Sequence, residues 1–354
     1  MKRLTLLLSW SVATVATLCS APAAEWRWVP FPDPQLEVRG LPWFKENSPE
    51  LWRLPKSAKG RVPNGVWNRA IAPDGGRIRV AATTTRLALR VQAATVPAKP
   101  CFIDAYVDDV LAGSVRVQTT ASAELVFFEG RDRARKNLTI YLPNNQETRV
   151  LAVGFDPEAQ LGPPPPFAQT APLICYGSSV LQGTGSHHPG TTYPAAVARR
   201  LNLDFVNLGF GGAGKAEPVV VALVNQLEGC GYLFDLGKSY GDQSGDAYVA
   251  MLAAVRVAHP GRPIFCVTPI YSSFEPKDAK YLAKSIRLRD MMRQAANDRR
   301  RAGDAATHVI EGLELFGAGD QALLRDPQHP NDEGNELMAR RLAPVLRPVI
   351  LGPP

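Results

Sequence analysis

The chain has 354 residues, a formal net charge of +7 and 45% hydrophobic residues. This length allows two domains, and this apolar content allows a substantial core. The basic residues are dispersed, and their one run, Arg299-Arg300-Arg301, falls at the end of an expected helix, where cations complement the helix dipole. The composition therefore argues against a nucleic-acid-binding protein. With five histidines and no cluster of metal-ligating residues, we expect neither a metal nor a cofactor.

The N-terminus has the pattern of an export signal. Met1-Lys2-Arg3 precedes an apolar run from Leu4 to Cys19, and Ala21-Pro22-Ala23 closes the run with small residues. This pattern is typical of a secretory signal peptide over residues 1–23, which predicts a secreted or periplasmic protein. Its removal lowers the formal charge to +5, because two cations and no acid are lost. We expect no membrane-spanning segment in the remainder, and the sequence leaves the oligomeric state open.

Four cysteines follow the signal segment, at Cys101, Cys175, Cys230 and Cys266. They are widely spaced and form no C-x-x-C pair. Cys175 and Cys266 fall in apolar, strand-like runs, which favours buried thiols that pack as small hydrophobes. In an exported protein two of them could also form a disulfide, and the sequence does not decide between these states.

The first half of the chain predicts an antiparallel β-sandwich over residues 24–160. Residues 24–60 are rich in aromatics and proline, and short alternating strands follow from Arg77 to Phe155. One clear hairpin runs from Asn137 to Val153, with its turn at Pro143-Asn144-Asn145-Gln146. Nothing in this half resembles a catalytic group. Its aromatic residues could bind sugar, although aromatics in a small sandwich more often belong to the core.

A proline run, Pro163-Pro164-Pro165-Pro166, predicts a stiff linker over residues 161–169. Beyond it, strands and helices alternate through residues 170–354. Such alternation predicts a parallel sheet covered on both faces, a three-layer α/β/α domain. The expected strands are Leu173–Tyr176, Leu203–Leu208, Tyr232–Leu236, Pro263–Thr268 and His308–Ile310. The expected helices are Thr192–Leu201, Pro218–Leu227, Ser244–Ala258, Ala279–Arg301 and Asp332–Leu346.

Two short stretches in this half carry the parts of a serine hydrolase. Leu173 to Gly183 reads as a buried strand that ends in Gly177 and two serines. Ligands bind at the carboxyl ends of strands in open α/β sheets. Asp326-Pro327-Gln328-His329-Pro330 precedes the last helix, and a turn there can place a carboxylate against an imidazole. A serine hydroxyl needs such a base to attack a carbonyl at neutral pH.

These residues resemble the ordered blocks of the SGNH (GDSL-type) hydrolases. The blocks are Gly177-Ser178-Ser179-Val180, then Asn207 to Gly212, then Asp326 to Pro330. The resemblance covers roughly residues 170–350 and implies a flavodoxin-like fold. In the first half, Phe102-Ile103-Asp104-Ala105-Tyr106 resembles a degenerate G-x-D-L-Y motif. This motif belongs to the β-domain that precedes the hydrolase in a subgroup of bacterial enzymes similar to carbohydrate esterases.

The resemblance implies a role for each matching residue. Ser179 would be the nucleophile, His329 the general base and then acid, and Asp326 the carboxylate that orients the imidazole. The backbone N–H groups of Ser179 and Gly212 would donate hydrogen bonds to the oxyanion of the acyl intermediate. The partners so implied are small esters or acylated carbohydrates. His187 and His188 lie just beyond the nucleophile and are candidate substrate contacts, with exposed loop positions as the alternative.

One block departs from the family pattern. After the third strand the family offers an asparagine side chain as an oxyanion donor, whereas this chain reads Gly237-Lys238-Ser239-Tyr240-Gly241. Ser239 stands at the expected position, and Lys238 beside it could also donate or contact substrate. Neither has the geometry of an amide. The same residues match the G-x-S-x-G nucleophile elbow of α/β-hydrolases, but an elbow runs directly into a helix and here a loop follows.

Three functions remain open from the sequence. The leading one is a secreted serine esterase that removes small acyl groups, acetyl above all, from carbohydrate. The second is a general carboxylester hydrolase or lipase. The third is a non-catalytic carbohydrate-binding protein whose oxyanion hole has degenerated.

Overall fold

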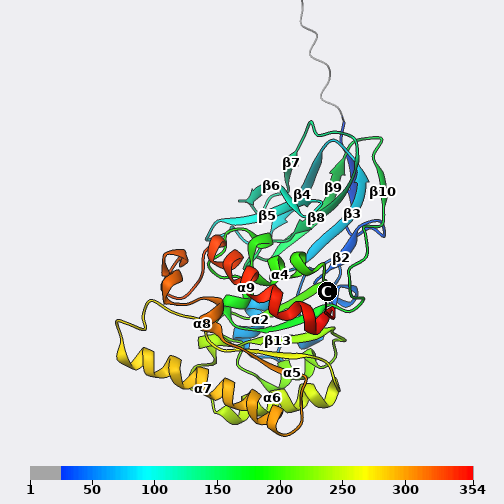
Figure 1. The fold of residues 1–354 in the computed structure, drawn as a ribbon. Coiled ribbons are helices and arrows are strands. Elements are labelled where there is room, and N and C mark those ends of the chain that lie inside the picture. Colours follow the sequence, from blue (N-terminus) through cyan, green and yellow to red (C-terminus); the bar gives the residue numbers. More distant parts are fainter. Residues whose placement is uncertain (1–24, 354) are drawn as a thin grey trace, which may run out of the picture.

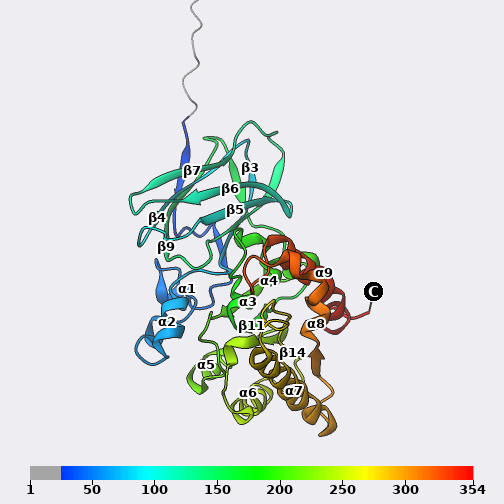
Figure 2. The ribbon, with the colours of Figure 1, turned by 90° about the vertical axis from the view of Figure 1, so that its left-hand side faces the viewer.

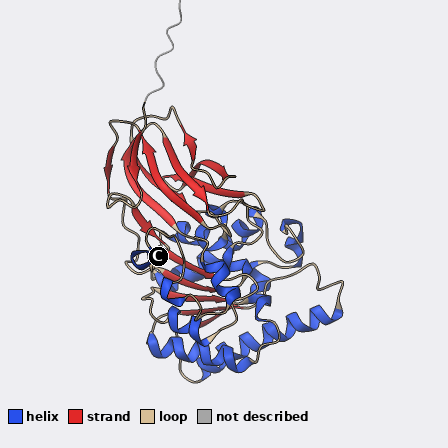
Figure 3. Cartoon of the chain, turned by 180° about the vertical axis from the view of Figure 1, so that it is seen from behind, coloured by secondary structure: helices blue, strands red, loops and turns tan. Residues whose placement is uncertain are grey.

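The computed structural model describes residues 25–353, and the predicted signal peptide lies outside this range. The described chain has two halves stacked along its long axis, a β-sandwich above and a mixed α/β domain below (Figure 1). Seen from behind, strands dominate the upper half and helices surround a smaller sheet in the lower half (Figure 3). The expected fold class, a three-layer α/β/α domain preceded by an antiparallel β-sandwich, is confirmed.

The upper half consists of two antiparallel sheets. One has the strand order β1-β9-β4-β7, and the other has the order β10-β3-β8-β5-β6, with β2 paired to β3. The strands of the first sheet are β1 (Arg27–Pro30), β4 (Leu87–Ala93), β7 (Ala123–Phe128) and β9 (Thr148–Phe155). Those of the second are β2 (Glu37–Arg39), β3 (Arg77–Thr83), β5 (Cys101–Val107), β6 (Val110–Val117), β8 (Arg135–Tyr141) and β10 (Gln160–Gly162).

The sandwich forms because its strands alternate apolar and polar residues. Ile78, Val80 and Ala82 of β3 face Leu87, Leu89 and Val91 of β4 in one cluster, and each of these six side chains is at most 1% exposed. A two-residue period places such side chains on one face of each sheet. The two strands of the predicted hairpin form as β8 and β9, but the hairpin itself is wrong: the strands belong to different sheets and pair with β3 and β4 instead of with each other.

The lower half is built on a parallel five-stranded sheet with the order β12-β11-β13-β14-β15. Its strands are β11 (Leu173–Gly177), β12 (Phe205–Gly209), β13 (Gly231–Asp235), β14 (Ile264–Val267) and β15 (Thr307–Ile310). All residues of the first four of these strands are buried, as expected for a sheet covered on both faces. The order reverses at β11, so that β12 and β13 flank it. This switch point is where the carboxyl ends of neighbouring strands leave room for a ligand.

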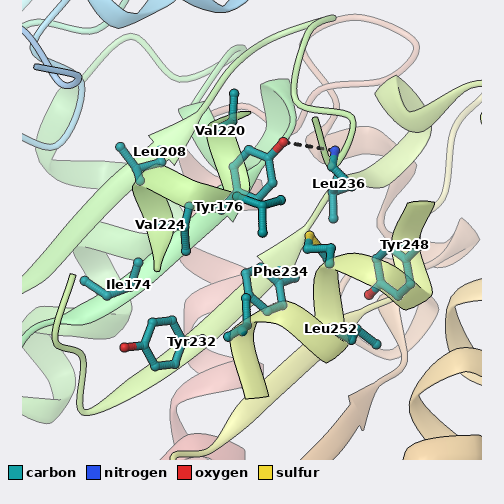
Figure 4. Packing of buried hydrophobic residues seen from close by; sticks show 14 of the residues in the cluster. Ile174, Tyr176, Leu208, Val220, Val224, Tyr232, Phe234, Leu236, Tyr248 and Leu252 are labelled. Atoms are coloured by element: carbon teal, nitrogen blue, oxygen red, sulfur yellow. Dashed lines mark hydrogen bonds between the residues drawn. The ribbon is translucent and has the colours of Figure 1, made fainter. Parts of the chain in front are cut away.

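Helices cover both faces of this sheet. α5 (Pro218–Val224), α6 (Gly245–Ala258) and α7 (Ala279–Arg301) pack on the face that carries Ile174 and Tyr176. α4 (Tyr193–Leu201) and α9 (Asp332–Ile350) pack on the opposite face, with Leu173 and Cys175. Figure 4 shows the first of these cores, where Tyr176 and Phe234 lie between sheet and helices. The shorter elements are α3 (Ser179–Gln182), η2 (Pro189–Thr191), η3 (Gly237–Tyr240), α8 (Gly312–Leu315) and η4 (Ala318–Leu323).

The N-terminal half does not end at the sandwich. Between β2 and β3 the chain forms α1 (Phe44–Asn47), η1 (Lys56–Ala58) and α2 (Asn64–Ala70). Figure 2 shows this blue segment descending from the sandwich alongside the α/β domain. Leu54, Val62 and Val66 of this segment are buried in the same cluster as Val206 and Leu208 of β12. The first third of the chain therefore completes the core of the last half.

The proline-rich linker lies against the sandwich. Its first two residues belong to β10, and Pro165 O accepts a hydrogen bond from Arg79 Nη2 at 2.8 Å. The Arg79 guanidinium stacks over the ring of Phe167 at 3.9 Å from the ring centroid. Residues 163–167 are thus held on the surface of β3.

All four cysteines of the described chain are free and buried. Burial raises the pKa of Cys101 to about 12 and that of Cys230 to about 11. This agrees with the interpretation of the thiols as small hydrophobic residues. No helix among residues 25–353 combines the length and the apolar character needed to cross a membrane.

Candidate active site

Ser179 lies where β11 gives way to α3, at the carboxyl edge of the parallel sheet. Ser178 occupies the position before the helix, and its N–H donates to Asp235 O at 2.7 Å, which fixes the end of β11 against β13. Gly177 is required for this approach, since a Cβ there would lie 1.9 Å from Asp235 O. The hydroxyl of Ser179 therefore emerges from a rigid strand end.

His329 and Asp326 meet Ser179 in a hydrogen-bonded series. Ser179 Oγ lies 2.8 Å from His329 Nε2, and His329 Nδ1 lies 2.8 Å from Asp326 Oδ2. An ionised carboxylate can only accept, so the hydrogen of the neutral ring is placed on Nδ1 and the Nε2 lone pair faces the serine hydroxyl. This is the tautomer that a general base requires.

Backbone N–H groups of the Asp-x-x-His turn fix the carboxylate of Asp326. Asp326 Oδ1 accepts hydrogen bonds from the backbone N–H groups of Gln328 and His329, at 2.9 and 3.0 Å. Burial alone would raise the pKa of Asp326, but these bonds and the His329 ring hold it below its ordinary value. Asp326 is therefore ionised at neutral pH, as its contact with the imidazole needs.

Gly212 and Ser239 come together beside the nucleophile. Gly212 follows β12 with a φ of +73°, a conformation that favours glycine, and its N–H donates to Ser239 Oγ at 3.3 Å. The neighbouring Gly211 approaches Ser179 so closely that a Cβ at 211 would lie 3.2 Å from that of Ser179. The loop after β12, the η3 segment and the nucleophile are thus adjacent.

A small cavity of about 30 Å³ lies at this junction. Its lining includes Ser179, Asp235, Lys238, Ile270 and His329. Asp235 is 2% exposed, and burial raises its pKa to about 6, although Oδ2 accepts a hydrogen bond from the Tyr193 hydroxyl.

Lys238 lines the same cavity as a partly buried cation. Its Nζ forms an ion pair with Glu275 Oε1 at 3.3 Å, and two hydrogen bonds from Arg289 hold the Glu275 carboxylate from the other side. Burial lowers the pKa of Lys238 to about 8, against the attraction of Glu275. The ammonium is thus directed to Glu275 and stays charged at neutral pH.

His187 and His188 lie elsewhere. Neither belongs to the lining of the cavity at Ser179. The Nδ1 atom of His188 lies 3.0 Å from Asp104 Oδ1, and its ring contacts Phe102 of the sandwich. Asp104 is fully buried and also accepts a hydrogen bond from Gly190 N at 3.0 Å. The two histidines therefore mark a contact between the halves, and the degenerate G-x-D-L-Y motif supplies the other side of it.

The rival nucleophile, Ser239, has a different setting from an elbow. It lies in the short 3-10 helix η3, and α6 begins only at Gly245. Its hydroxyl contacts Gly212 N–H, whereas the base His329 contacts Ser179. The structure thus favours Ser179 over Ser239 as the nucleophile.

Sequence reasoning missed a set of buried polar residues behind the site. Gln182, Asp74 and Arg53 are fully buried and connected to one another beneath the loop that carries Gly212. Gln182 lies in the motif quoted above, but an amide at the end of a helix gives no signal by itself. Arg53 lies in a stretch without periodicity, so only the tertiary structure reveals its contacts.

The doubly wound sheet, with a serine, a histidine and an aspartate in series at its carboxyl edge, is the architecture of a serine hydrolase. The family model of GDSL-like lipases and acylhydrolases matches residues 170–347, and the N-terminal domain of SGNH-hydrolase-type esterases, GxDLY, matches residues 26–161. The chain belongs to this family of SGNH esterases and acylhydrolases, and it is a carboxylic ester hydrolase.

Solved structures of similar proteins cover both halves. The salicylyl-acyltransferase SsfX3 from a tetracycline biosynthetic pathway is 26% identical, with a TM-score of 0.78 over 92% of this chain and 99% of its own. A GDSL-like lipase from Bacteroides ovatus is 20% identical, with a TM-score of 0.79 over 92% and 98%. A family two carbohydrate esterase from Clostridium thermocellum, in complex with cellohexaose, is 16% identical, with a TM-score of 0.60 over 78% and 94%. A search of curated protein sequences gave no match.

Proposed function

We propose that the protein is an exported serine esterase that removes small acyl groups, acetyl above all, from carbohydrate. The observation that carries the proposal is the series Ser179 Oγ, His329 Nε2 and Nδ1, and Asp326 Oδ2, with 2.8 Å at each contact. Ser179 would attack the ester carbonyl while His329 takes its proton and then passes it to the leaving alcohol. Water would hydrolyse the acyl-enzyme by the same route in reverse.

The oxyanion would be held by the backbone N–H groups of Ser179 and Gly212 and by the Ser239 hydroxyl. In the free enzyme Gly212 N–H is occupied by Ser239 Oγ. A developing negative charge is a stronger acceptor than a hydroxyl, so it would draw both donors toward itself. Ser239 thus takes the place of the family's asparagine, and each such donor contributes roughly 3 kcal/mol to transition-state stabilisation in related chemistry.

The dimensions of the site support a small acyl group and a larger alcohol. The cavity at Ser179 is small, about 30 Å³, which favours a short acyl group. An open hollow of about 420 Å³ borders Gly212, and Lys215, Glu217 and Gln243 add polar side chains to a mostly apolar lining. Hydroxyl-rich sugars are bound by such groups. The carbohydrate esterases with the same fold lend further support.

Labelling with a fluorophosphonate probe tests the mechanism, because only an activated serine reacts. The mature protein should be modified at Ser179, and turnover of 4-nitrophenyl acetate should vanish in Ser179→Ala. Modification at Ser239 in its place would contradict the proposal.

Acetate release from acetylated xylan, with little activity on long-chain 4-nitrophenyl esters, tests the substrate. The opposite preference would favour a general carboxylester hydrolase or lipase.

Acyl transfer to an alcohol other than water is the second candidate. It is favoured by the likeness to a salicylyl-acyltransferase along nearly the whole of both chains. Turnover of 4-nitrophenyl acetate in the presence of butanol or a sugar separates the two. A hydrolase releases acetate at the rate of 4-nitrophenol, whereas a transferase diverts most of the acyl group to the added alcohol.

A further inference from the structure

Gln182 connects the nucleophile helix to the loop that carries Gly212. It is the last residue of α3, one turn beyond Ser179, and it is fully buried. Its Oε1 accepts a hydrogen bond from Gly211 N at 2.7 Å, and its Nε2 donates to Asp74 Oδ1 at 3.1 Å. Gly211 N–H and Gly212 N–H belong to successive peptide units. Fixing the first therefore restrains the direction of the second.

Asp74 decides which way the amide of Gln182 faces. A carboxylate only accepts, so it selects the NH₂ end of the amide and turns the carbonyl toward Gly211. If the amide were reversed, its NH₂ would oppose the N–H of Gly211, and the carbonyl oxygen would oppose the carboxylate. Both contacts would be repulsive and neither group could turn to water, since Asp74 and Gln182 are fully buried.

Arg53 provides the counter-charge that keeps this arrangement in place. Its side chain is fully buried, and its Nη2 lies 3.5 Å from Asp74 Oδ2. The other N–H groups donate to backbone carbonyls, among them Asn207 O at 3.0 Å and Gly209 O at 2.6 Å, at the end of β12. The same guanidinium thus holds both the carboxylate behind Gln182 and the strand end from which the Gly212 loop departs.

We propose that Gln182, oriented by Asp74 and Arg53, is a positioning residue that aims the Gly211–Gly212 peptide at the oxyanion. This inference rests on the proposed function and adds to it a contribution from the N-terminal third of the chain. Gln182 touches neither the substrate nor the reacting atoms, and it acts through the backbone of the loop. Its loss should therefore lower the rate of the chemical step more than it weakens substrate binding.

The test replaces Gln182 by methionine, which has nearly the same volume and no amide. In the folded variant, kcat for 4-nitrophenyl acetate should fall about 10- to 100-fold while KM changes less than about twofold. Asp204→Asn is the control for the loss of a buried polar contact. Like Asp74 behind Gln182, Asp204 is a buried aspartate paired with an arginine of the first half, Arg77, but it lies just before β12, at the opposite end of the strand from Gly212. Its kcat should stay within about twofold of the wild type.

A thionoester substrate separates positioning of oxyanion donors from general damage. Sulfur is a weak hydrogen-bond acceptor, so 4-nitrophenyl thionoacetate gains little from these donors in any variant. The wild-type preference for the oxygen ester over the thionoester should therefore shrink in Gln182→Met and persist in Asp204→Asn. Equal loss on both substrates, or an unchanged kcat in Gln182→Met, would overturn the inference.

Gln182→Glu serves if the methionine variant does not fold. In its protonated form the introduced carboxyl group can donate to Asp74 and accept from Gly211, whereas in its ionised form it repels Asp74. The ratio of the variant's kcat to that of the wild type should rise as the pH is lowered from about 8 to about 6, and a flat ratio would contradict the inference.

Fluorophosphonate labelling of the wild type is measured first. An unreactive Ser179 would overturn the proposed function together with this inference, whereas a reactive Ser179 with an unchanged substrate ratio would overturn the inference alone.

Discussion

At the scale of single residues, the proposed oxyanion donor is where we expect this chain to depart from its family. We propose that Ser239 takes the place of an asparagine, and its hydroxyl lies 3.3 Å from the Gly212 nitrogen. Lys238 lies one residue earlier, but its ammonium is paired with Glu275. We therefore propose Ser239 as the side-chain donor and Lys238 as part of the wall of the cavity at Ser179.

Ser239→Ala should lower kcat about 10- to 100-fold with little change in KM, because the lost bond forms only as charge develops. Lys238→Met should change kcat by less than about threefold. Steady-state kinetics on 4-nitrophenyl acetate checks both. The reverse ranking, with a wild-type rate that declines above pH 8 as the Lys238 ammonium loses its proton, would transfer the role to Lys238, whose pKa is lowered to about 8.

Asp235 predicts a dependence of stability on pH. Burial raises the pKa of its carboxyl from 3.8 to about 6, so the native state favours the protonated form. The stabilisation that protonation gives is complete below pH 3.8 and is lost as the pH rises through 6. Asp235→Asn keeps an oxygen for the Tyr193 hydroxyl and never ionises.

The free energy of unfolding of Asp235→Asn, relative to the wild type, should therefore increase between pH 4 and pH 7, by at most about 3 kcal/mol. It should stay constant at higher pH. Urea unfolding at pH 4, 5, 6 and 7 measures the difference. A difference that is independent of pH would show that Asp235 has the same pKa in the native and unfolded states, so that burial does not raise it.

At the scale of elements, the close approach of β11 and β13 holds the nucleophile in place. A Cβ at Gly177 would lie 1.9 Å from Asp235 O, and backbone cannot move aside cheaply. Gly177→Ala should therefore destabilise the protein by about 3 kcal/mol or more and lower the reactivity of Ser179.

Gly319→Ala is the matched control for this change, since no atom lies within 4 Å of the added methyl group in the described structure. Thermal unfolding and the rate of fluorophosphonate labelling provide the readouts. Equal stability of the two alanine variants would show that the strand ends have room to separate.

The sequence predicts many of these elements because their signals are local. Asp278 accepts from the first N–H groups of α7 and the helix spans Ala279–Arg301 as expected, while Ser244 caps α6. The last helix extends four residues beyond the predicted end, to Ile350. Pro344 and Pro348 lie inside this helix and do not terminate it. Thr192 precedes α4 but does not cap it with its side chain, because its hydroxyl donates to Pro189 O. The side chain of Asn335, from α9, accepts the hydrogen bond from the N–H of Tyr193 instead.

The parts of the site behind Ser179 could not be predicted, because they depend on contacts between distant segments. Ser179, Asp326 and His329 stand in short motifs with defined spacing. Arg53 belongs to no motif. Its structural role depends on contacts such as the hydrogen bond to Asn207 O, which is 154 residues away in the sequence. The prediction that β8 and β9 pair as a hairpin was wrong for a related reason. The alternation in β8 and β9 specifies which side chains face inward, but the partner of each strand is chosen by packing of the whole sandwich.

At the scale of the whole molecule, the two halves share a core and a buried polar interface. The segment from Leu54 to Ala70 buries apolar side chains against β12, and Arg77 pairs with Asp204 while stacking on Phe205. Removing the first half would expose this surface and leave the carbonyls of Asn207 and Gly209 without their buried donor. Such groups are costly to leave unpaired.

A truncated protein consisting of residues 163–354 should therefore lack a cooperative unfolding transition and bind the dye ANS, whereas the mature chain should unfold in one step. Urea titration followed by circular dichroism, with ANS fluorescence in parallel, tests this. A stable and soluble fragment that still reacts with a fluorophosphonate would show that the hydrolase half folds without the sandwich.

The separation of the contacting residues along the chain has a consequence for biogenesis. Ser179 and His329 are 150 residues apart, and Arg53 reaches Gly209 across 156. Contacts that close such long loops form late, after local helices and hairpins. Esterase activity should therefore appear only when the last helix has docked, later than the recovery of secondary structure. A chromogenic ester would then report on completed folding, and a chain that has not yet docked its last helix would not hydrolyse it.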